Sequence, residues 1–186
     1  MSWVWHVHLS TIWRMVEEVH KGGKSEHVYI SLGSNLGDRA GILAIAIKCI
    51  TQSKCTLISK SPIYETAPWG MNSELWFLNQ VIEVTTIISP ANLMSYLLQI
   101  ENDLGRERGK SFSYMDRAID LDILFYGKKI VNSSQLQIPH PKISDRLFIL
   151  KPFLDLNPNF IHPKTSLSIK AHYDKCGDKT LIKEWR

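Results

Sequence analysis

Residues 27–52 read HVYISLGSNLGDRAGILAIAIKCITQ, and this stretch decides the fold. Its first six residues, HVYISL, have the β-branched and aromatic composition of a strand. The turn residues GSNLG follow, and Asp38 is suited to cap a helix, because its side chain accepts hydrogen bonds from the first helical turn. Apolar residues recur up to about Gln52 at the spacing of one helical face. The stretch therefore predicts a strand, a turn and a helix in succession.

Two further strands and a second helix are predicted from the residues that follow. Thr56–Glu65 and Phe77–Thr86 alternate in polarity as strands do. A helix then begins at Ser89, which is a good N-cap, with Pro90 in the first helical position. Gly105 ends this helix, because glycine readily adopts the left-handed conformation found at helix C-termini.

The second half of the chain supplies the last element of the pattern. A polar, arginine-rich loop covers 106–117, and the residues 118–126 form a predicted strand. A short strand near 130–132 and a final helix from Ser144 or Asp145 to about Asp155 follow. The order strand–helix–strand–strand–helix–strand predicts an α+β fold with a ferredoxin-like βαββαβ core and an extra C-terminal strand and helix.

The first 26 residues differ from the rest of the chain. They contain three tryptophans and end in the break Gly22-Gly23-Lys24-Ser25. We expect residues 1–26 to be a mobile N-terminal extension and residues 27–186 to form a single domain, since 186 residues is an ordinary size for one domain.

Composition narrows the class of protein and its location. The three cysteines form no C-x-x-C pair, which is typical of reduced thiols and predicts a cytoplasmic protein. No stretch approaches 18 apolar residues, so no membrane span is expected. The net charge of +4 suits an anionic ligand and does not require nucleic acid.

Two carboxylates in the last predicted strand are the strongest indication of chemistry. Asp120 and Asp122 lie two residues apart in the segment IDLDI, so both side chains face one side of the sheet. Two carboxylates on one face repel each other unless a cation lies between them. Hard oxygen ligands at this spacing suit Mg²⁺, and two ions could be bridged. A solvated sheet face with two acids is the alternative for such a short motif.

Basic residues on either side of this pair favour the metal interpretation. Arg106, Arg108, Lys110 and Arg117 precede it, and His140 and Arg146 follow. Cations around two carboxylates are what a metal–polyphosphate complex needs. The chain has neither a P-loop nor a G-x-G-x-x-G motif.

A second group of residues indicates a flat, polar ring as ligand. The loop Thr66-Ala67-Pro68-Trp69-Gly70 precedes Phe77 and Asn79 on the next strand. Aromatic side chains hold a heterocycle by its faces, and an amide bonds to its edge. Taken alone, Phe77 would more often be a core residue.

Six segments follow one another in the order of a known enzyme family. They are YISLGSNLGDR (29–39), SPIYETAPWG (61–70), FLN (77–79), GRER (105–108), RAIDLDILFYG (117–127) and IPHPKISDRLFIL (138–150). Spanning about 28–153, they resemble the 6-hydroxymethyl-7,8-dihydropterin pyrophosphokinase family of folate biosynthesis. The resemblance implies an ATP-dependent enzyme that transfers diphosphate to the pterin hydroxymethyl group and releases AMP.

The resemblance also implies partners and site residues. The partners are ATP and 6-hydroxymethyl-7,8-dihydropterin, without nucleic acid or membrane, and the protein is expected to be a monomer. Two Mg²⁺ ions bind Asp120 and Asp122. The implied catalytic residues are Arg106, Arg117, Asp120 and Asp122. The implied ATP-binding residues are Glu101, Arg106, Arg108, Arg117, Ile123, His140 and Arg146. The implied pterin-binding residues are Thr66, Ala67, Trp69, Phe77, Asn79, Tyr114 and Phe148.

Several positions depart from the family pattern. Tyr114 stands where tryptophan is usual, and Asp116 adds a negative charge near the expected phosphates. Gln135 replaces a nucleotide-contacting arginine, and Gln137 replaces a threonine. We therefore expect weaker ATP binding rather than loss of activity.

Two rival interpretations fit fewer of the residues. Another metal-dependent phosphotransferase or phosphohydrolase would keep Asp120 and Asp122 but would not need the segment 66–79. A ferredoxin-like RNA-binding module would need a run of aromatics on a central strand, and its phosphates would be repelled by the two acids.

Overall fold

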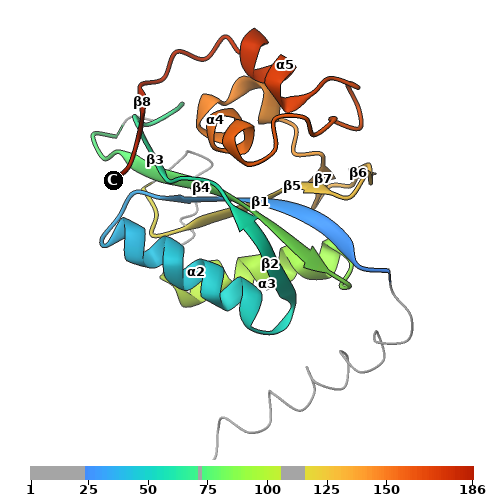
Figure 1. Ribbon diagram of the computed structural model, residues 1–186. Helices are drawn as coiled ribbons and strands as arrows, with labels where there is room; N and C mark the ends of the chain where they lie inside the picture. Colours follow the sequence, from blue (N-terminus) through green and yellow to red (C-terminus); the bar gives the residue numbers. More distant parts are fainter. Residues whose placement is uncertain (1–23, 71–72, 106–115) are drawn as a thin grey trace, which may run out of the picture.

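The computed structural model describes residues 24–70, 73–105 and 116–186, which pack around one antiparallel sheet (Figure 1). The strand order is β5-β1-β4-β3-β8, and β2 also pairs with β4. Residues 1–23 of the predicted extension lie outside the described residues. The strands of this sheet are β1 (Glu26–Ser34), β2 (Cys55–Lys60), β3 (Tyr64–Thr66), β4 (Phe77–Thr86), β5 (Asp120–Tyr126) and β8 (Ile182–Glu184).

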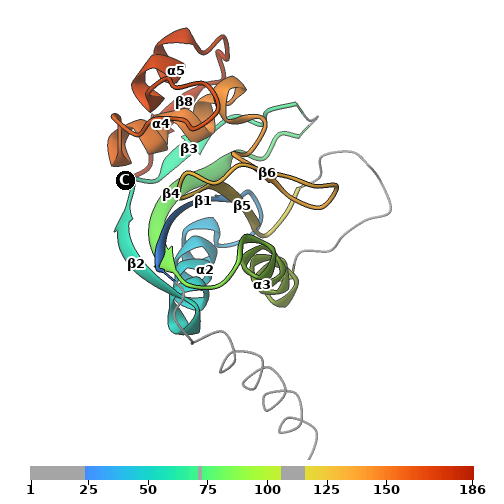
Figure 2. The ribbon, with the colours of Figure 1, turned by 90° about the vertical axis from the view of Figure 1, so that its right-hand side faces the viewer.

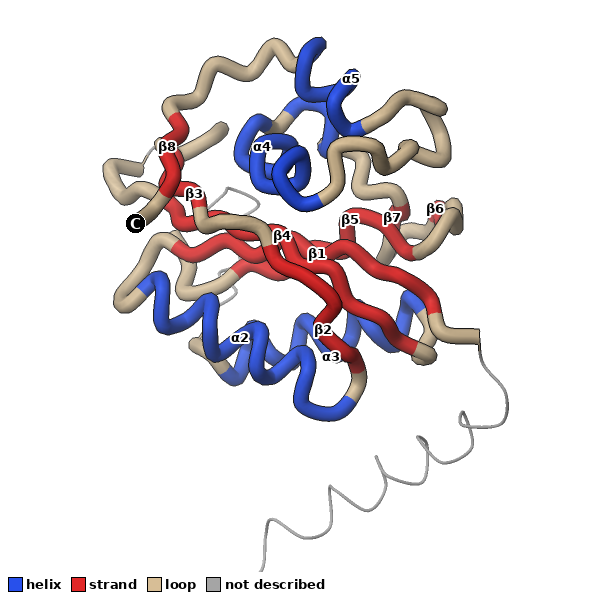
Figure 3. The backbone as a smooth tube through the Cα atoms, in the orientation of Figure 1, coloured by secondary structure: helices blue, strands red, loops and turns tan. Residues whose placement is uncertain are grey.

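Helices cover both faces of the sheet (Figures 1 and 2). Helices α2 (Arg39–Ser53) and α3 (Pro90–Asp103) lie on one face, and α4 (Leu147–Leu156) and α5 (Ile169–Lys175) lie on the other. The tube in Figure 3 shows the strands as a layer between these two helical layers. The remaining elements are the strands β6 (Val131–Asn132) and β7 (Gln137–Ile138) and the 3₁₀ helix η1 (Ile143–Asp145). Within the described residues, no helix has the length and apolar character needed to cross a membrane.

The predicted starts of the first two helices are confirmed. The Asp38 carboxylate accepts a hydrogen bond from the Gly41 amide at 3.0 Å, at the start of α2. The Ser89 hydroxyl accepts one from the Asn92 amide at 3.2 Å, directly before Pro90. Each bond satisfies an amide that has no partner within its own helix. Local sequence therefore sets the start of both helices on this face.

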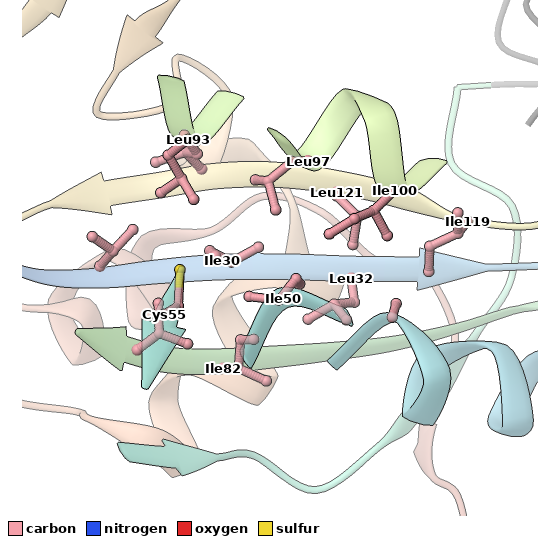
Figure 4. Packing of buried hydrophobic residues seen from close by; sticks show 14 of the residues in the cluster. Ile30, Leu32, Ile50, Cys55, Ile82, Leu93, Leu97, Ile100, Ile119 and Leu121 are labelled. Atoms are coloured by element: carbon pink, nitrogen blue, oxygen red, sulfur yellow. The ribbon is translucent and has the colours of Figure 1, made fainter. Parts of the chain in front are cut away.

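The core between the sheet and helices α2 and α3 is aliphatic (Figure 4). Ile30 and Leu32 of β1 project toward Ile50 of α2 and toward Leu97 of α3. All four side chains are fully buried or nearly so. Burying one such side chain contributes about 1.5–3 kcal/mol, so this layer holds both helices on the sheet.

The opposite face of the sheet carries an aromatic cluster under α4. Tyr29 and Phe125 come from the sheet, and Phe153 comes from α4. The rings of Tyr29 and Phe153 are 4.7 Å apart, and those of Phe125 and Phe160 are 4.5 Å apart. Contacts of this kind fix α4 over the middle of the sheet.

The segment predicted as one strand over Thr56–Glu65 is two strands in the structure. β2 ends at Lys60 and β3 begins at Tyr64. Between them, the Ser61 main chain bonds to Val81, and its carbonyl accepts a hydrogen bond from the Gln80 side chain at 2.7 Å. Pro62 cannot donate to a strand partner, which explains the interruption.

The C-terminal part also differs from the prediction. The final predicted helix is a 3₁₀ turn, η1, followed by α4. Two elements beyond it, α5 and β8, were not predicted. β8 joins the main sheet beside β3, so the end of the chain lies next to a strand more than 100 residues earlier.

Candidate active site

A pocket with about 600 Å³ of empty space, partly open to solvent, lies on the same face of the sheet as α4. Its floor comes from β1, β4 and β5, and one wall comes from the first turn of α4. Ten residues predicted for the site line it: Thr66, Ala67, Trp69, Phe77, Asn79, Arg117, Asp120, Asp122, Arg146 and Phe148.

The strand register places both carboxylates in this pocket. Asp120 pairs with Gly33 and Asp122 pairs with Ser31, so small residues lie opposite both acids. Their side chains are 28% and 32% exposed. Leu121, between them, is buried in the core on the other face, as the alternation predicted.

Arg117 lies between the acidic end of the pocket and an aromatic ring. Its Nη1 is 3.2 Å from Asp120 Oδ2, and its guanidinium lies 5.8 Å from the Phe77 ring centre. The Arg117 amide donates to Asn35 Oδ1 at 2.7 Å, and Asn35 Nδ2 donates to Asp116 Oδ1 at 2.6 Å. The turn after β1 therefore fixes the backbone that carries this arginine.

His140 approaches the second carboxylate from beyond β5. Its Nε2 lies 3.8 Å from Asp122 Oδ2. Burial, followed by the positive charge of Arg146, lowers the pKa of His140 to about 4. The ring is thus neutral at neutral pH, and its contact with Asp122 is not an ion pair there. A neutral imidazole carries one N–H donor beside the acidic end.

The other end of the pocket is aromatic. The rings of Trp69 and Phe148 meet edge to face, with centres 6.2 Å apart. The Arg146 guanidinium lies 5.0 Å from the Trp69 ring centre and 5.5 Å from that of Phe148. The buried Asn79 donates to Thr66 Oγ1 at 2.8 Å. Aromatic faces together with a fixed amide suit a flat ring with polar edges.

Three predicted residues of the described chain do not line this pocket: His140, Glu101 and Ile123. Glu101 is fully buried, and its carboxylate accepts a hydrogen bond from the Leu121 amide at 2.7 Å. Ile123 packs in the core beneath the opposite face. Glu101 therefore contacts β5, the strand that carries Asp120 and Asp122, and Ile123 belongs to that strand. Arg106, Arg108 and Tyr114 lie outside the described residues.

Four lining residues were not predicted, namely Ser31, Leu32, Gly33 and Gln80. Gly33 was assigned to the turn, whereas β1 continues through Ser34. A Cβ on Gly33 would lie 3.2 Å from Asn79 Oδ1 and 3.9 Å from Asp120 Cβ. A glycine inside a strand is itself a signal for such a close approach.

The donor set at the acidic end fits Mg²⁺ that arrives with a polyphosphate. Within the described ranges, no group of three or more His, Cys, Asp or Glu side chains is arranged to hold a metal ion. Mg²⁺ sites often use only one or two carboxylates and complete their coordination with phosphate oxygens and water. Asp120 and Asp122 supply such a pair of carboxylates.

Comparison with known proteins gives a family match over most of the chain. A family model described as 7,8-dihydro-6-hydroxymethylpterin-pyrophosphokinase (HPPK) matches residues 29–158. The folic acid synthesis protein fol1 of Pneumocystis carinii is 42% identical over 157 residues, which are 84% of this chain and 21% of that protein. The 2-amino-4-hydroxy-6-hydroxymethyldihydropteridine pyrophosphokinase of Bacillus subtilis is 40% identical over 129 residues, or 69% of this chain and 76% of the relative.

Solved structures share the fold. The crystal structure of Plasmodium falciparum HPPK-DHPS wild type with SDX-DHP matches with a TM-score of 0.68 at 16% identity, over 84% of this chain and 45% of that one. The chain spans only about a fifth to a third of three longer relatives, including the mitochondrial folate synthesis bifunctional protein of Pisum sativum, of which it covers 33%.

Proposed function

The chain belongs to the 7,8-dihydro-6-hydroxymethylpterin-pyrophosphokinase family, and on this premise we propose that it transfers diphosphate from ATP to 6-hydroxymethyl-7,8-dihydropterin. The hydroxymethyl group accepts the diphosphate, and AMP leaves. This is a step of folate biosynthesis. The observation that carries the proposal is one pocket with two carboxylates at one end and an aromatic and amide group at the other.

The aromatic end is suited to the pterin. Trp69 and Phe148 offer ring faces and edges, and Asn79 offers an amide that Thr66 holds in place. The pterin carries hydrogen-bonding groups around a flat ring, so a fixed amide discriminates it from an apolar ring of similar size. Ala67 and Phe77 complete this end.

The acidic end is suited to the phosphates of ATP. Arg117 and Arg146 both line the pocket and can neutralise phosphate charge. Neutral His140 can donate a hydrogen bond to a phosphate oxygen without adding charge. Diphosphate transfer depends on in-line positioning and charge neutralisation, and these residues supply both.

Asp120 and Asp122 would hold Mg²⁺ at this end, and we propose two ions. When bound, Mg²⁺ neutralises developing charge on the phosphates and favours ionisation of the attacking alcohol. Asp120 lies beside Arg117 and Asp122 beside His140, so the two carboxylates would fix where the phosphates lie. Bound substrates would exclude water from the pocket, which would prevent hydrolysis from competing with transfer.

The remaining assignments belong to the same proposal. Glu101 and Ile123 would contribute to ATP binding through the position of β5, Arg106 and Arg108 would bind ATP, and Tyr114 would bind the pterin. The strand order of the main sheet supports a ferredoxin-like core, and residues 27–186 would form a single domain. We propose a cytoplasmic monomer.

A nucleotide product assay tests the function directly. The protein is incubated with ATP, Mg²⁺ and 6-hydroxymethyl-7,8-dihydropterin, and AMP is separated from ADP. We expect AMP that depends on the pterin, with no free pyrophosphate. ADP would indicate transfer of a single phosphate, and no turnover would contradict the proposal.

Replacement of either acid tests the metal assignment. We expect Asp120→Asn and Asp122→Asn each to lower kcat at least about a hundredfold, because each removes a charge that acts on the transferring group. Steady-state kinetics at saturating substrates measures the loss. Asp103→Asn, at the exposed end of α3, is the matched control. Full activity in either site variant at ordinary Mg²⁺ concentrations would refute the assignment.

A further inference from the structure

The C-terminal segment Asp178–Trp185 lies beyond the residues that match the family model, yet it contacts two walls of the pocket. One wall is the first turn of α4, with Arg146 and Phe148. The other is the end of β3 and the residue after it, Thr66 and Ala67. The two walls are more than 70 residues apart in the chain. They are joined directly by the hydrogen bond from the Tyr64 hydroxyl of β3 to Asp155 of α4, and a second time by the C-terminal segment.

Asp178 fixes the first wall. Its Oδ2 accepts a hydrogen bond from the Leu147 amide at 2.9 Å, and Leu147 lies between the pocket residues Arg146 and Phe148. The residue in the N-cap position of α4 is Arg146, whose guanidinium has only donors. The acceptor that a helix N-terminus needs therefore comes from Asp178, whose negative charge also suits that end of the helix.

The same carboxylate is tied into its own segment. Asp178 Oδ1 accepts hydrogen bonds from the Thr180 amide at 2.9 Å and from the Thr180 hydroxyl at 2.5 Å. Each carboxylate oxygen of Asp178 therefore has its own partner: Oδ2 bonds to α4, and Oδ1 bonds to Thr180. The side chain links α4 to the backbone that continues into β8.

Three residues further on, the segment holds the second wall. The Ala67 amide donates to the Leu181 carbonyl at 3.1 Å, and β8 pairs with β3 so that Ile182 lies opposite Thr66. The Trp185 amide donates to the carbonyl of Ile63, the residue directly before β3, at 2.8 Å. Both views of the ribbon show β8 beside β3 (Figures 1 and 2).

An ionic cluster behind β3 reinforces this wall. The Glu65 side chain, 10% exposed, lies between Arg39 Nη2 and Lys183 Nζ, each at 2.8 Å. The pKa of Glu65 is lowered, mainly by the hydrogen bond from Lys183. Arg39 Nη1 also donates to the Trp76 carbonyl at 2.6 Å, at the far end of the segment that follows β3. Lys183 of β8 is therefore linked through Glu65 and Arg39 to both ends of that segment.

We propose that the span Asp178–Leu181 is a strut that sets the separation of the two walls, and that Asp178 is a positioning residue for the pterin. The proposal rests on the proposed function. Without the Asp178 carboxylate, the first turn of α4 relaxes, and Phe148 moves relative to Thr66 and Ala67. The carboxylates on β5 are not joined to the strut, so the phosphate end should change less.

The test compares Asp178→Ala with Asp174→Ala, a matched control on α5 whose exposed carboxylate forms an ion pair with Lys170 of the same helix. We expect Asp178→Ala to raise the KM for the pterin about tenfold. The KM for ATP should rise less than about threefold, and kcat should stay within about twofold. Pterin titration followed by intrinsic tryptophan fluorescence should give the same rise in Kd without turnover.

Two further variants keep the test decisive. Asp178→Asn retains one accepting oxygen and should fall between the parent and Asp178→Ala. Thr180→Val removes one bond to Asp178 and should raise the pterin KM by about threefold, even if Asp178→Ala does not fold.

The outcomes separate the strut from the proposed function. If the parent makes no AMP and binds no pterin, both fall. If the parent is active but Asp178→Ala and Thr180→Val match Asp174→Ala in pterin KM and Kd, the strut alone is refuted. Equal rises in the KM for ATP and for the pterin would also refute it, since a general loss of structure would do the same.

Discussion

At the scale of the residue, Gly33 determines how much room the pocket has beside its amide. A Cβ at this position would lie 3.2 Å from Asn79 Oδ1, which is closer than an ordinary contact. Asn79 cannot move freely, because its amide nitrogen donates to Thr66. A side chain on Gly33 would therefore displace a group proposed to bind the pterin.

We expect Gly33→Ala to raise the KM for the pterin about tenfold with little change in the KM for ATP. Steady-state kinetics with each substrate varied in turn measures both values. Gly177→Ala is the control, since nothing lies within 4 Å of the Cβ it would gain. An unchanged pterin KM in Gly33→Ala would mean that the amide is not a pterin contact.

The hydrogen bond between Asn35 and Asp116 can be tested by swapping the two side chains. Asn35 receives a bond from the Arg117 amide and donates to Asp116, which also accepts from Ser73 Oγ at 2.6 Å. The Asp116 carboxylate, expected near the phosphates, is thus bonded to the turn after β1. Its effect on ATP affinity stays a prediction.

We expect Asn35→Asp to lower kcat about tenfold, because two carboxylates then face each other and displace the backbone of Arg117. The double variant Asn35→Asp with Asp116→Asn restores one amide and one carboxylate, so it should recover most of the activity. Kinetics and urea unfolding of the single and double variants measure the coupling. A double variant no better than Asn35→Asp would show that the pair does not position Arg117.

At the scale of the element, α5 is joined to its neighbours by two buried histidines. The His172 ring contacts Ser144 Oγ at 3.0 Å and Thr165 Oγ1 at 2.7 Å, and it lies 5.2 Å from the His162 ring. Burial lowers the pKa of both histidines. Both are therefore neutral in the folded protein at pH values where an exposed histidine already carries charge.

This burial predicts a pH-dependent stability. As the pH falls below the ordinary histidine pKa of about 6.5, the unfolded chain binds protons that the folded chain does not, so the free energy of unfolding decreases. Urea unfolding at pH about 7.5 and about 5.5 measures the change, above the range where carboxylates titrate. His172→Gln should reduce the difference between the two pH values. An equal difference in His172→Gln and the parent would contradict the assignment.

The elements that sequence predicted well are those whose signals are local. Asp38 and Ser89 sit directly before the helices they cap, so a short window contains the whole signal. The division between β2 and β3 also has a local signal in Pro62, which was not used, whereas β8 depends on pairing with β3. Such a distant partner leaves no periodic pattern in the segment itself.

The site residues also divide into those with a local signal in the sequence and those that depend on distant partners. Strand alternation was enough to place Asp120 and Asp122 on one face, and the structure confirms that alternation. Gly33 was taken for a turn residue because glycine is commoner there than inside strands. Asp178 carries no motif, since its part depends on the position of α4 after folding.

At the scale of the whole molecule, one sheet separates two cores. The aliphatic core under α2 and α3 and the aromatic core under α4 share β1, β4 and β5, so neither core can form without the sheet. A shared central layer favours cooperative unfolding.

We therefore expect the described part of the chain to unfold in a single transition. Hydrogen exchange in increasing urea measures this: the slowest amides of β1 and those of α4 should reach the same opening free energy. Loss of protection in α4 well before β1 would show instead that the aromatic layer unfolds separately.

The alternation along β1 divides the effects of mutation in this chain. Val28 and Ile30 face the aliphatic core, whereas Ser31 and Gly33 line the pocket. Substitutions at the first set would lower the amount of folded protein in the cell, and those at the second would lower the turnover of each molecule. Neighbouring positions of β1 would thus evolve under different selection, one for the amount of folded protein and the next for catalysis.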